Sequence, residues 1–458
     1  MQEAGSAGKG NGGRKGPSLS PYSNLLKFSF FNATTWMIAM GTPLVLLASE
    51  LGASSFEVGL IYSFVFLLLP VQIIATSTLP KLGYKKQIML AWIARGASLI
   101  IPFLLALQAP DTAPRWMVHA LILSAFLFAF FRTFGSCALP PLLYATMPDS
   151  VRGRYFSTDQ AVAATAGILT LLLLAVLFRM VPAFTAFAWQ YAYALFAVIM
   201  TLFYMARVKD PPKPVQTSLR EIALETPKIS LQPSPFRQYL VFMIASALMG
   251  TAFVPLKAYY LKVEAGIGTD QILLYTAIQY FGAIMGTMLL RKHIDGLGVK
   301  PIFRISLFLG AVVSIYWLLL VRGTVPGMEK LLMVAYFLFG ISASQWLTAH
   351  LKYMPRVCSE KRQALHVSVH AAIVGIVGGI APIVWGYLVK TPGTPGVDRE
   401  VFAIFFIAML FVQVLLFLYI PHLTSQHRDR PPLQTGSGLL RPFRYLGGLI
   451  NIIPEKRR

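Results

Sequence analysis

Residues 208–236, VKDPPKPVQTSLREIALETPKISLQPSPF, form the longest polar stretch between apolar segments of this chain. A helix needs roughly 20 apolar residues to cross the hydrocarbon core of a bilayer, which is about 30 Å thick. Six such segments precede the stretch and six follow it, which predicts an all-α membrane protein with twelve transmembrane helices in two sets of six. The expected spans are 25–48, 56–79, 87–108, 115–147, 155–180, 183–206, 237–261, 269–290, 301–321, 328–353, 362–389 and 400–421.

The composition also places the chain among membrane proteins. Hydrophobic residues make up 56% of the 458 residues and charged residues only 13%, whereas a soluble chain needs more charge to cover its surface. The first twenty residues contain no apolar core of the kind that a cleavable signal requires, so the first span is expected to act as an uncleaved insertion signal. The two cysteines, Cys137 and Cys358, are predicted to be free thiols.

The net charge of +22 is distributed unevenly along the chain. When both termini are placed in the cytoplasm, 30 of the 40 Lys and Arg residues fall in cytoplasmic segments, as the positive-inside rule requires. We therefore expect a multi-pass protein of the plasma membrane, or of the bacterial inner membrane in a prokaryote, with both termini cytoplasmic. This charge is expected to contact anionic lipid headgroups rather than nucleic acid.

The predicted topology divides the chain into five segments. They are a cytoplasmic N-terminal tail (1–24), an N-terminal six-helix bundle (25–207), a cytoplasmic linker (208–236), a C-terminal six-helix bundle (237–421) and a basic cytoplasmic tail (422–458). Within the last segment, residues 439–458 mix apolar and basic residues, so they are expected to lie on the inner membrane surface or to be disordered.

Three short motifs recur in the two halves at near-constant offsets and at the same topological places. The pairs are Met40-Gly41-Thr42 and Met249-Gly250-Thr251, Lys81–Lys85 and Gly298–Lys300, and Met147-Pro148 and Met354-Pro355. Such recurrence indicates an internal duplication, and duplicated bundles around a central pathway are typical of transporters.

The loop after the second span resembles the loop motif of the major facilitator superfamily, which usually reads Gly-x-x-x-Asp-Arg-x-Gly-Arg-Lys-Lys. The glycine and basic positions are kept, whereas the first glycine and the aspartate are absent from the first copy. The resemblance covers 25–421 and implies two six-helix repeats that work by alternating access. It also implies a gating role at the cytoplasmic side for Lys81, Gly83, Lys85, Asp295, Gly298 and Lys300.

Three cations lie inside predicted spans, where a charge costs about 3 kcal/mol on insertion scales. Arg132 lies halfway along the fourth span, which lines the cavity in the superfamily, so it is predicted to present a permanent cation to the substrate. The alternative is a structural arginine bound to backbone carbonyls. Lys257 in the seventh span is a second substrate candidate, and snorkelling to the outer interface explains it equally well. Arg95 lies in the peripheral third span, so a structural partner is expected for it.

Neutral polar and aromatic side chains on the lining helices are expected to form the cavity wall. The alternative for each is interhelical hydrogen bonding, worth about 0.6 kcal/mol. The candidates are Asn32, Trp36, Tyr260, Gln279, Gln345 and Trp346.

No carboxylate lies deep in any predicted span, which leaves histidine as the group that titrates near neutrality. His350, His366 and His370 are expected at similar depth near the cytoplasmic side, where they are candidates for proton coupling; ordinary polar packing is the alternative. The sequence contains no metal-ligand cluster, cofactor motif or catalytic constellation, so no metal, cofactor or enzymatic activity is predicted.

These features predict a secondary active transporter that moves a small solute across the membrane by alternating access. The cation at Arg132 favours an anionic solute. The alternative is a protein of the same fold that senses a ligand, or assists the assembly of a membrane complex, without transporting anything.

Overall fold

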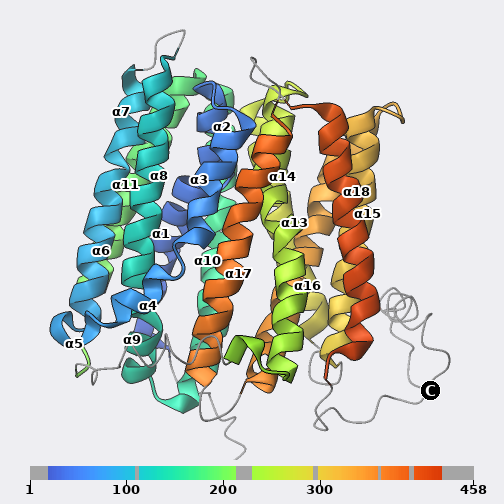
Figure 1. The fold of residues 1–458 in the computed structure, drawn as a ribbon. Coiled ribbons are helices and arrows are strands. Elements are labelled where there is room, and N and C mark those ends of the chain that lie inside the picture. Colours follow the sequence, from blue (N-terminus) through green and yellow to red (C-terminus); the bar gives the residue numbers. More distant parts are fainter. Residues whose placement is uncertain are drawn as a thin grey trace, which may run out of the picture.

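The computed structural model describes residues 19–108, 113–212, 229–291, 298–358, 363–390 and 397–424. Most of the predicted linker, most of both tails and Asp295 lie outside these ranges. Within them the chain is almost entirely helical, and the β pairing is limited to an isolated bridge between Lys390 and Val397. Twelve helical segments are long and apolar enough to cross a membrane, and Figure 1 shows the helices side by side. The predicted number of transmembrane helices is confirmed.

The first six spans include four that are assembled from two helices each. The four divided spans are α1 (Ser23–Met40) with α2 (Thr42–Glu50), α3 (Ser55–Leu67) with α4 (Val71–Thr76), α6 (Tyr84–Ser98) with α7 (Ile100–Gln108), and α8 (Arg115–Ser136) with α9 (Leu139–Thr146). The fifth and sixth spans are the single helices α10 (Asp149–Met180) and α11 (Ala183–Ala206). The short α5 (Leu79–Leu82) connects the second span to the third.

The last six spans each contain one continuous α-helix. These are α13 (Pro235–Val263), α14 (Thr269–Arg291), α15 (Val299–Arg322), α16 (Leu332–Val357), α17 (Gln363–Leu388) and α18 (Arg399–Tyr419). Three short 3-10 helices complete the described structure, namely η1 (Ser20–Tyr22), η2 (Met328–Leu331) and η4 (Ile420–His422).

Two of the helix breaks have a local cause in the sequence. The fourth span breaks at Pro140-Pro141, because α9 begins one residue earlier, with proline in its first turn. Proline is tolerated there because the first-turn N–H groups have no intrahelical partner. In the first span, Gly41 is extended between α1 and α2 (φ −89°, ψ −166°), and Pro43 then lies in the first turn of α2.

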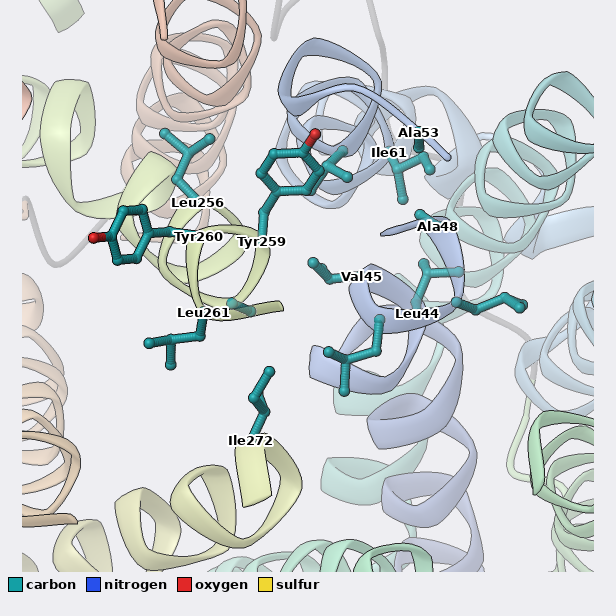
Figure 2. Packing of buried hydrophobic residues seen from close by; sticks show 14 of the residues in the cluster. Leu44, Val45, Ala48, Ala53, Ile61, Leu256, Tyr259, Tyr260, Leu261 and Ile272 are labelled. Carbon is teal, nitrogen blue, oxygen red and sulfur yellow. The ribbon is translucent and has the colours of Figure 1, made fainter. Parts of the chain in front are cut away.

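The two halves meet differently at the two ends of the bundle. We call the end where α11 finishes and α13 begins the linker end, and the opposite end, where α2 finishes and α3 begins, the far end. At the far end, one buried hydrophobic cluster includes residues of both halves. Figure 2 shows Leu44 and Val45 of α2 opposite Tyr259 and Leu261 of α13, with Ile272 of α14 beside them.

At the linker end, the buried hydrophobic residues form two separate clusters. One contains only residues of the first half, among them Trp92 and Tyr155, and the other contains only residues of the second half, among them Phe236 and Tyr353. Within the described ranges, the hydrophobic core that joins the halves therefore belongs to the far end.

Close backbone contact holds α3 of the first half against α17 of the second. The Ser55 hydroxyl donates a hydrogen bond to the Gly386 carbonyl at 2.8 Å. A Cβ atom added to Gly59 would collide with the Pro382 carbonyl oxygen. Small residues that let two backbones approach are a common basis of helix association in membranes.

Candidate substrate site

Arg132 and Trp36 form one cluster in the first half. The guanidinium carbon of Arg132, on α8, lies 4.0 Å from the centre of the Trp36 ring on α1, which is a cation–π contact. The Arg132 side chain is half-buried. Within the described part of the chain, its guanidinium group has neither a carboxylate partner nor a hydrogen bond.

Arg95 lies behind this cluster and is almost fully buried, with 1% of its surface exposed. Its Nη2 atom donates to Asn32 Oδ1 at 2.6 Å, and Trp92 Nε1 donates to the same oxygen at 3.1 Å. The guanidinium carbon also lies 4.1 Å from the centre of the Trp92 ring. Asn32, a predicted wall residue, is thus the structural partner that was expected for Arg95.

The two arginines contact the same group of aromatic rings, because the guanidinium carbon of Arg95 lies 5.2 Å from the centre of the Phe128 ring, and that ring lies 6.5 Å from the ring of Trp36. No carboxylate among the described residues makes an ion pair with either of them. Two cations of this kind in a low-dielectric setting are unfavourable unless an anion compensates them. The arrangement can therefore bind an anionic group that reaches Arg132.

Lys257 is enclosed in the second half rather than extended to the membrane interface. Its side chain is 3% exposed, and its amine donates to Gln279 Oε1 at 2.5 Å. Rings of Tyr336 and Phe339 lie 4.1 and 4.2 Å from Nζ. The structure therefore brings two predicted site residues, Lys257 and Gln279, together inside an aromatic box, and it does not support the snorkelling alternative.

The remaining predicted wall residues occupy different environments. Gln345 is 2% exposed and its Nε2 donates to the Gly286 carbonyl at 2.7 Å, which is an interhelical bond. Tyr260 is buried and its ring packs against Phe402 at 5.4 Å between centroids. Trp346 lines a cavity inside the second half and stacks on Phe242 at 5.4 Å.

The structure brings two of the three predicted histidines together. The His350 and His370 rings lie 5.1 Å apart, and the Tyr239 hydroxyl lies 2.6 Å from His350 Nδ1. The Nε2 atom of His370 is buried without a hydrogen-bond partner among the described residues. His366 instead packs edge-on against Phe236 at 4.8 Å.

The lysines of the repeated loop motif make equivalent contacts in the two halves. Lys85 Nζ donates to the carbonyls of Ala206 and Val208, at the end of the sixth span, at 2.6 and 2.8 Å. Lys300 Nζ donates to the Pro421 carbonyl, at the end of the twelfth span, at 2.9 Å. Each of these bonds joins the third span of a half to the last span of the same half.

The other predicted gating residues lie beside these lysines. Lys81 lies in α5, and Gly83 follows with a positive φ of 81°, a conformation that favours glycine. Gly298 precedes α15 as its N-cap residue. Asp295 lies outside the described residues. The gating role of this motif stays a prediction.

Sequence reasoning did not single out the cavity that Trp346 lines. It has a volume of about 350 Å³ and its wall includes Phe66, Gly250 and Gln413. Gly250 was noted only as part of a repeated tripeptide. Hydropathy gives no signal for such a cavity, because its lining residues look like those of any apolar span.

The sequence matches a known protein family over both halves. The family model described as Major Facilitator Superfamily matches the chain twice, over residues 27–254 and 239–450. The chain belongs to the major facilitator superfamily. The double match agrees with the predicted fold of twelve transmembrane helices in two six-helix repeats, which is confirmed.

Solved structures of major facilitator superfamily transporters share this fold at low sequence identity. The inward-open xylose transporter XylE from E. coli gives a TM-score of 0.68 at 11% identity, covering 89% of this chain and 97% of that one. A variant of the nucleoside transporter NupG gives 0.67 at 13% identity, covering 88% and 99%. An inward-facing bacterial homologue of the iron transporter ferroportin gives 0.66 at 12% identity, covering 90% and 100%.

No curated protein matches the sequence. Membership of the superfamily supports a multi-pass membrane transporter and points to a transporter rather than an enzyme. Identities this low establish the fold and leave the substrate open.

Proposed function

We propose that this protein is a secondary active transporter that moves a small organic anion by alternating access, with Arg132 as the cation that binds the substrate. The observation that carries the proposal is the pair of guanidinium groups, Arg95 and Arg132, with no carboxylate paired to them in the described structure. Arg132 is half-buried and Arg95 is enclosed, so a ligand reaches Arg132 first.

Charge compensation is the physical reason for this assignment. A charge inside a membrane protein usually has a counter-charge, backbone carbonyls or water around it. Arg95 has the Asn32 amide oxygen, whereas among the described residues the guanidinium group of Arg132 contacts only the face of the Trp36 ring. A carboxylate or phosphate that binds Arg132 supplies the missing charge and two strong hydrogen bonds.

The side of the membrane to which the transport pathway opens depends on the orientation of the protein in the membrane. We propose this orientation from the distribution of charge. The Lys and Arg distribution favours a cytoplasmic linker end, with both termini inside. The shared core and two ion pairs between described residues of the two halves, Glu50–Lys262 and Arg179–Asp270, then lie at the outer face. In this orientation the conformation is inward-facing.

A proton is the coupling ion that the histidine cluster favours. His350 and His370 share an enclosed site with the Tyr239 hydroxyl, whereas His366 lies apart from it. If this pair couples transport to protons, His370→Gln abolishes uptake driven by a pH gradient but keeps substrate exchange between equal concentrations. A variant that loses neither activity, or loses both equally, contradicts the coupling role.

Thermal stabilisation tests the anion proposal directly. A ligand that binds only the folded state raises the melting temperature, so purified protein is screened against carboxylates, phosphates, neutral sugars and organic cations. Carboxylates or phosphates are expected to stabilise the wild type and not Arg132→Ala. The matched control is Arg322→Ala, which removes an exposed arginine at the end of α15 and is expected to respond like the wild type. Stabilisation by neutral or cationic solutes alone, or an unchanged response of Arg132→Ala, overturns the proposal.

The sensor or assembly-factor alternative predicts binding without flux. Proteoliposomes loaded with the stabilising anion distinguish the two functions. Counterflow of labelled anion supports a transporter, and saturable binding with no counterflow supports the alternative.

A further inference from the structure

A partly open cavity of about 350 Å³ lies in the second half between α13, α15, α16, α17 and α18. Its wall includes Met409 from the far-end cluster and Leu416 from the linker-end cluster of the same half. The cavity therefore interrupts the core of this half midway between the two ends. Its size falls within the range of small-molecule sites and far exceeds an ordinary packing defect.

The lining of the cavity is chemically suited to an apolar group. No charged side chain lines it among the described residues, and Phe339 and Trp346 present aromatic surfaces. The hydroxyls of Ser306 and Ser342 are already used, because each donates to the carbonyl of the other residue at 2.8 and 2.9 Å. Gln413 accepts a bond from Ser314 at 3.1 Å, which leaves its amide N–H groups for one polar contact in the cavity.

Gly250 keeps part of this space open. A Cβ atom added to Gly250 would meet nothing within 4 Å. At Gly340 in the same half, by contrast, a Cβ atom would collide with the Gln279 carbonyl oxygen, so that glycine serves helix packing. A glycine inside a helix costs stability relative to alanine, and no packing contact in the described structure requires the glycine at position 250.

The cavity lies at about the same depth as Arg132. Lys262 and Glu50 are ion-paired at 2.8 Å, so the ends of α13 and α2 are level. Trp36, which stacks on Arg132, precedes Glu50 by 14 residues, and Gly250 precedes Lys262 by 12. At 1.5 Å per helical residue Gly250 lies about 18 Å below the ion pair, and Trp36 lies about 21 Å or slightly more below it, because the single residue Gly41 between α1 and α2 is extended.

The cavity also reaches the boundary between the two halves. Phe66 of α3 is the lining residue that comes from the first half. A Cβ atom on Gly378 of α17 would lie 3.7 Å from the Phe66 ring and 3.1 Å from Thr251 of α13. Phe66 therefore lies where α3, α13 and α17 meet, so a movement of the halves changes how it covers the cavity.

We propose that this cavity is an apolar subsite of the transport site, which holds the aromatic or alkyl part of an amphipathic organic anion while the charged group of that anion binds Arg132. This inference rests on the proposed function. It narrows the substrate class from small anions in general to anions with an apolar body.

Calorimetric titration of the full-length protein in nanodiscs with acetate, benzoate and naphthoate tests the subsite. In the wild type, affinity is expected to rise at least about tenfold from acetate to naphthoate, because burial of some 60 Å² of apolar surface is worth a factor of ten. Gly250→Leu places four carbon atoms in the cavity and is expected to reduce this gain strongly while acetate binding is retained. Gly250→Ala is expected to stay within about twofold of the wild type, because one methyl group leaves most of the volume free.

A control variant and a neutral ligand show whether loss of binding in Gly250→Leu comes from the cavity. Leu248→Phe adds volume on the same helix at a side chain that is 43% exposed, and it is expected to leave all three affinities unchanged. If Gly250→Ala is already as defective as Gly250→Leu, Gly250 serves as a hinge and the subsite is wrong. Equal wild-type affinity for the three carboxylates also overturns the subsite but leaves the anion proposal standing. Binding of neutral naphthalenemethanol, lost in Gly250→Leu, with no binding of any carboxylate supports the cavity and overturns the anion proposal instead.

Discussion

The amine of Lys262 lies 2.8 Å from a carboxylate oxygen of Glu50, and this ion pair joins the end of α13 to the end of α2. The two residues belong to different halves of the protein. Their side chains are 21% and 24% exposed, so water screens the pair less than it screens a fully exposed one. The ion pair therefore stabilises the conformation in which the far end is closed.

Glu50→Gln is expected to weaken far-end closure by about 1 kcal/mol, which corresponds to about a fivefold shift toward the alternative conformation. The measurement is the rate of maleimide labelling of a cysteine introduced at Leu44, which is buried in the far-end cluster. Cys137 and Cys358 are first replaced by serine, because both are free thiols. The labelling rate is expected to rise about fivefold.

Two further variants test whether the ion pair between Glu50 and Lys262 causes this change in labelling rate. Glu50→Lys combined with Lys262→Glu is expected to restore slow labelling. Arg115→Gln breaks the ion pair with Glu57, which lies within the first half at 2.6 Å, and is expected to leave labelling unchanged. Equally fast labelling of the single variant and the exchanged pair contradicts the role of the ion pair.

Asn32→Asp is expected to lower the affinity for anions without unfolding the protein. The new carboxylate would lie where Asn32 Oδ1 now accepts bonds from Arg95 and Trp92, and it would compensate part of the positive charge. Asn32→Ala removes the acceptor instead and leaves Arg95 and Trp92 unsatisfied, at a cost of about 2 kcal/mol in stability. Anion titration and thermal unfolding of both variants measure these effects. An Asp variant that binds anions as tightly as the wild type argues against charge compensation.

Lys257→Met is expected to leave the melting temperature unchanged or higher. Methionine fills a similar volume, and the substitution removes a cation that is 3% exposed and bound to a single amide oxygen. Thermal unfolding of the variant checks this expectation, with Lys262→Met as the control that breaks an ion pair. A clear loss of stability in Lys257→Met alone would show that the amine contributes more than it costs.

Gly59→Val is expected to destabilise the protein by about 2 kcal/mol, because the added atoms collide with the Pro382 carbonyl at the contact between α3 and α17. Gly250→Val places similar atoms in open space and is expected to be tolerated. Comparing the two melting temperatures separates steric crowding from the general effect of adding a β-branched residue to a helix. Similar losses in both variants contradict this expectation.

Hydropathy by itself determined the number of transmembrane helices. The physical reason is that a bilayer requires every spanning segment to have mostly apolar side chains and an internally hydrogen-bonded backbone, so length and composition are sufficient. Pro140-Pro141 fixed the start of α9 in the same way, because proline acts through its own backbone. The free state of Cys137 and Cys358 also followed from the sequence and is confirmed.

The tertiary structure decided what each polar side chain contacts. Arg95 and Asn32 are 63 residues apart, and His350 and His370 come from two different helices, so no local pattern predicts that they meet. The tripeptides at Gly41 and Gly250 show most directly that a local sequence pattern does not determine its structural environment. The first ends a helix, and the second lies in a continuous helix beside a cavity. The rotation of each helix and the identity of its neighbours set these environments, and both depend on how all twelve helices pack together.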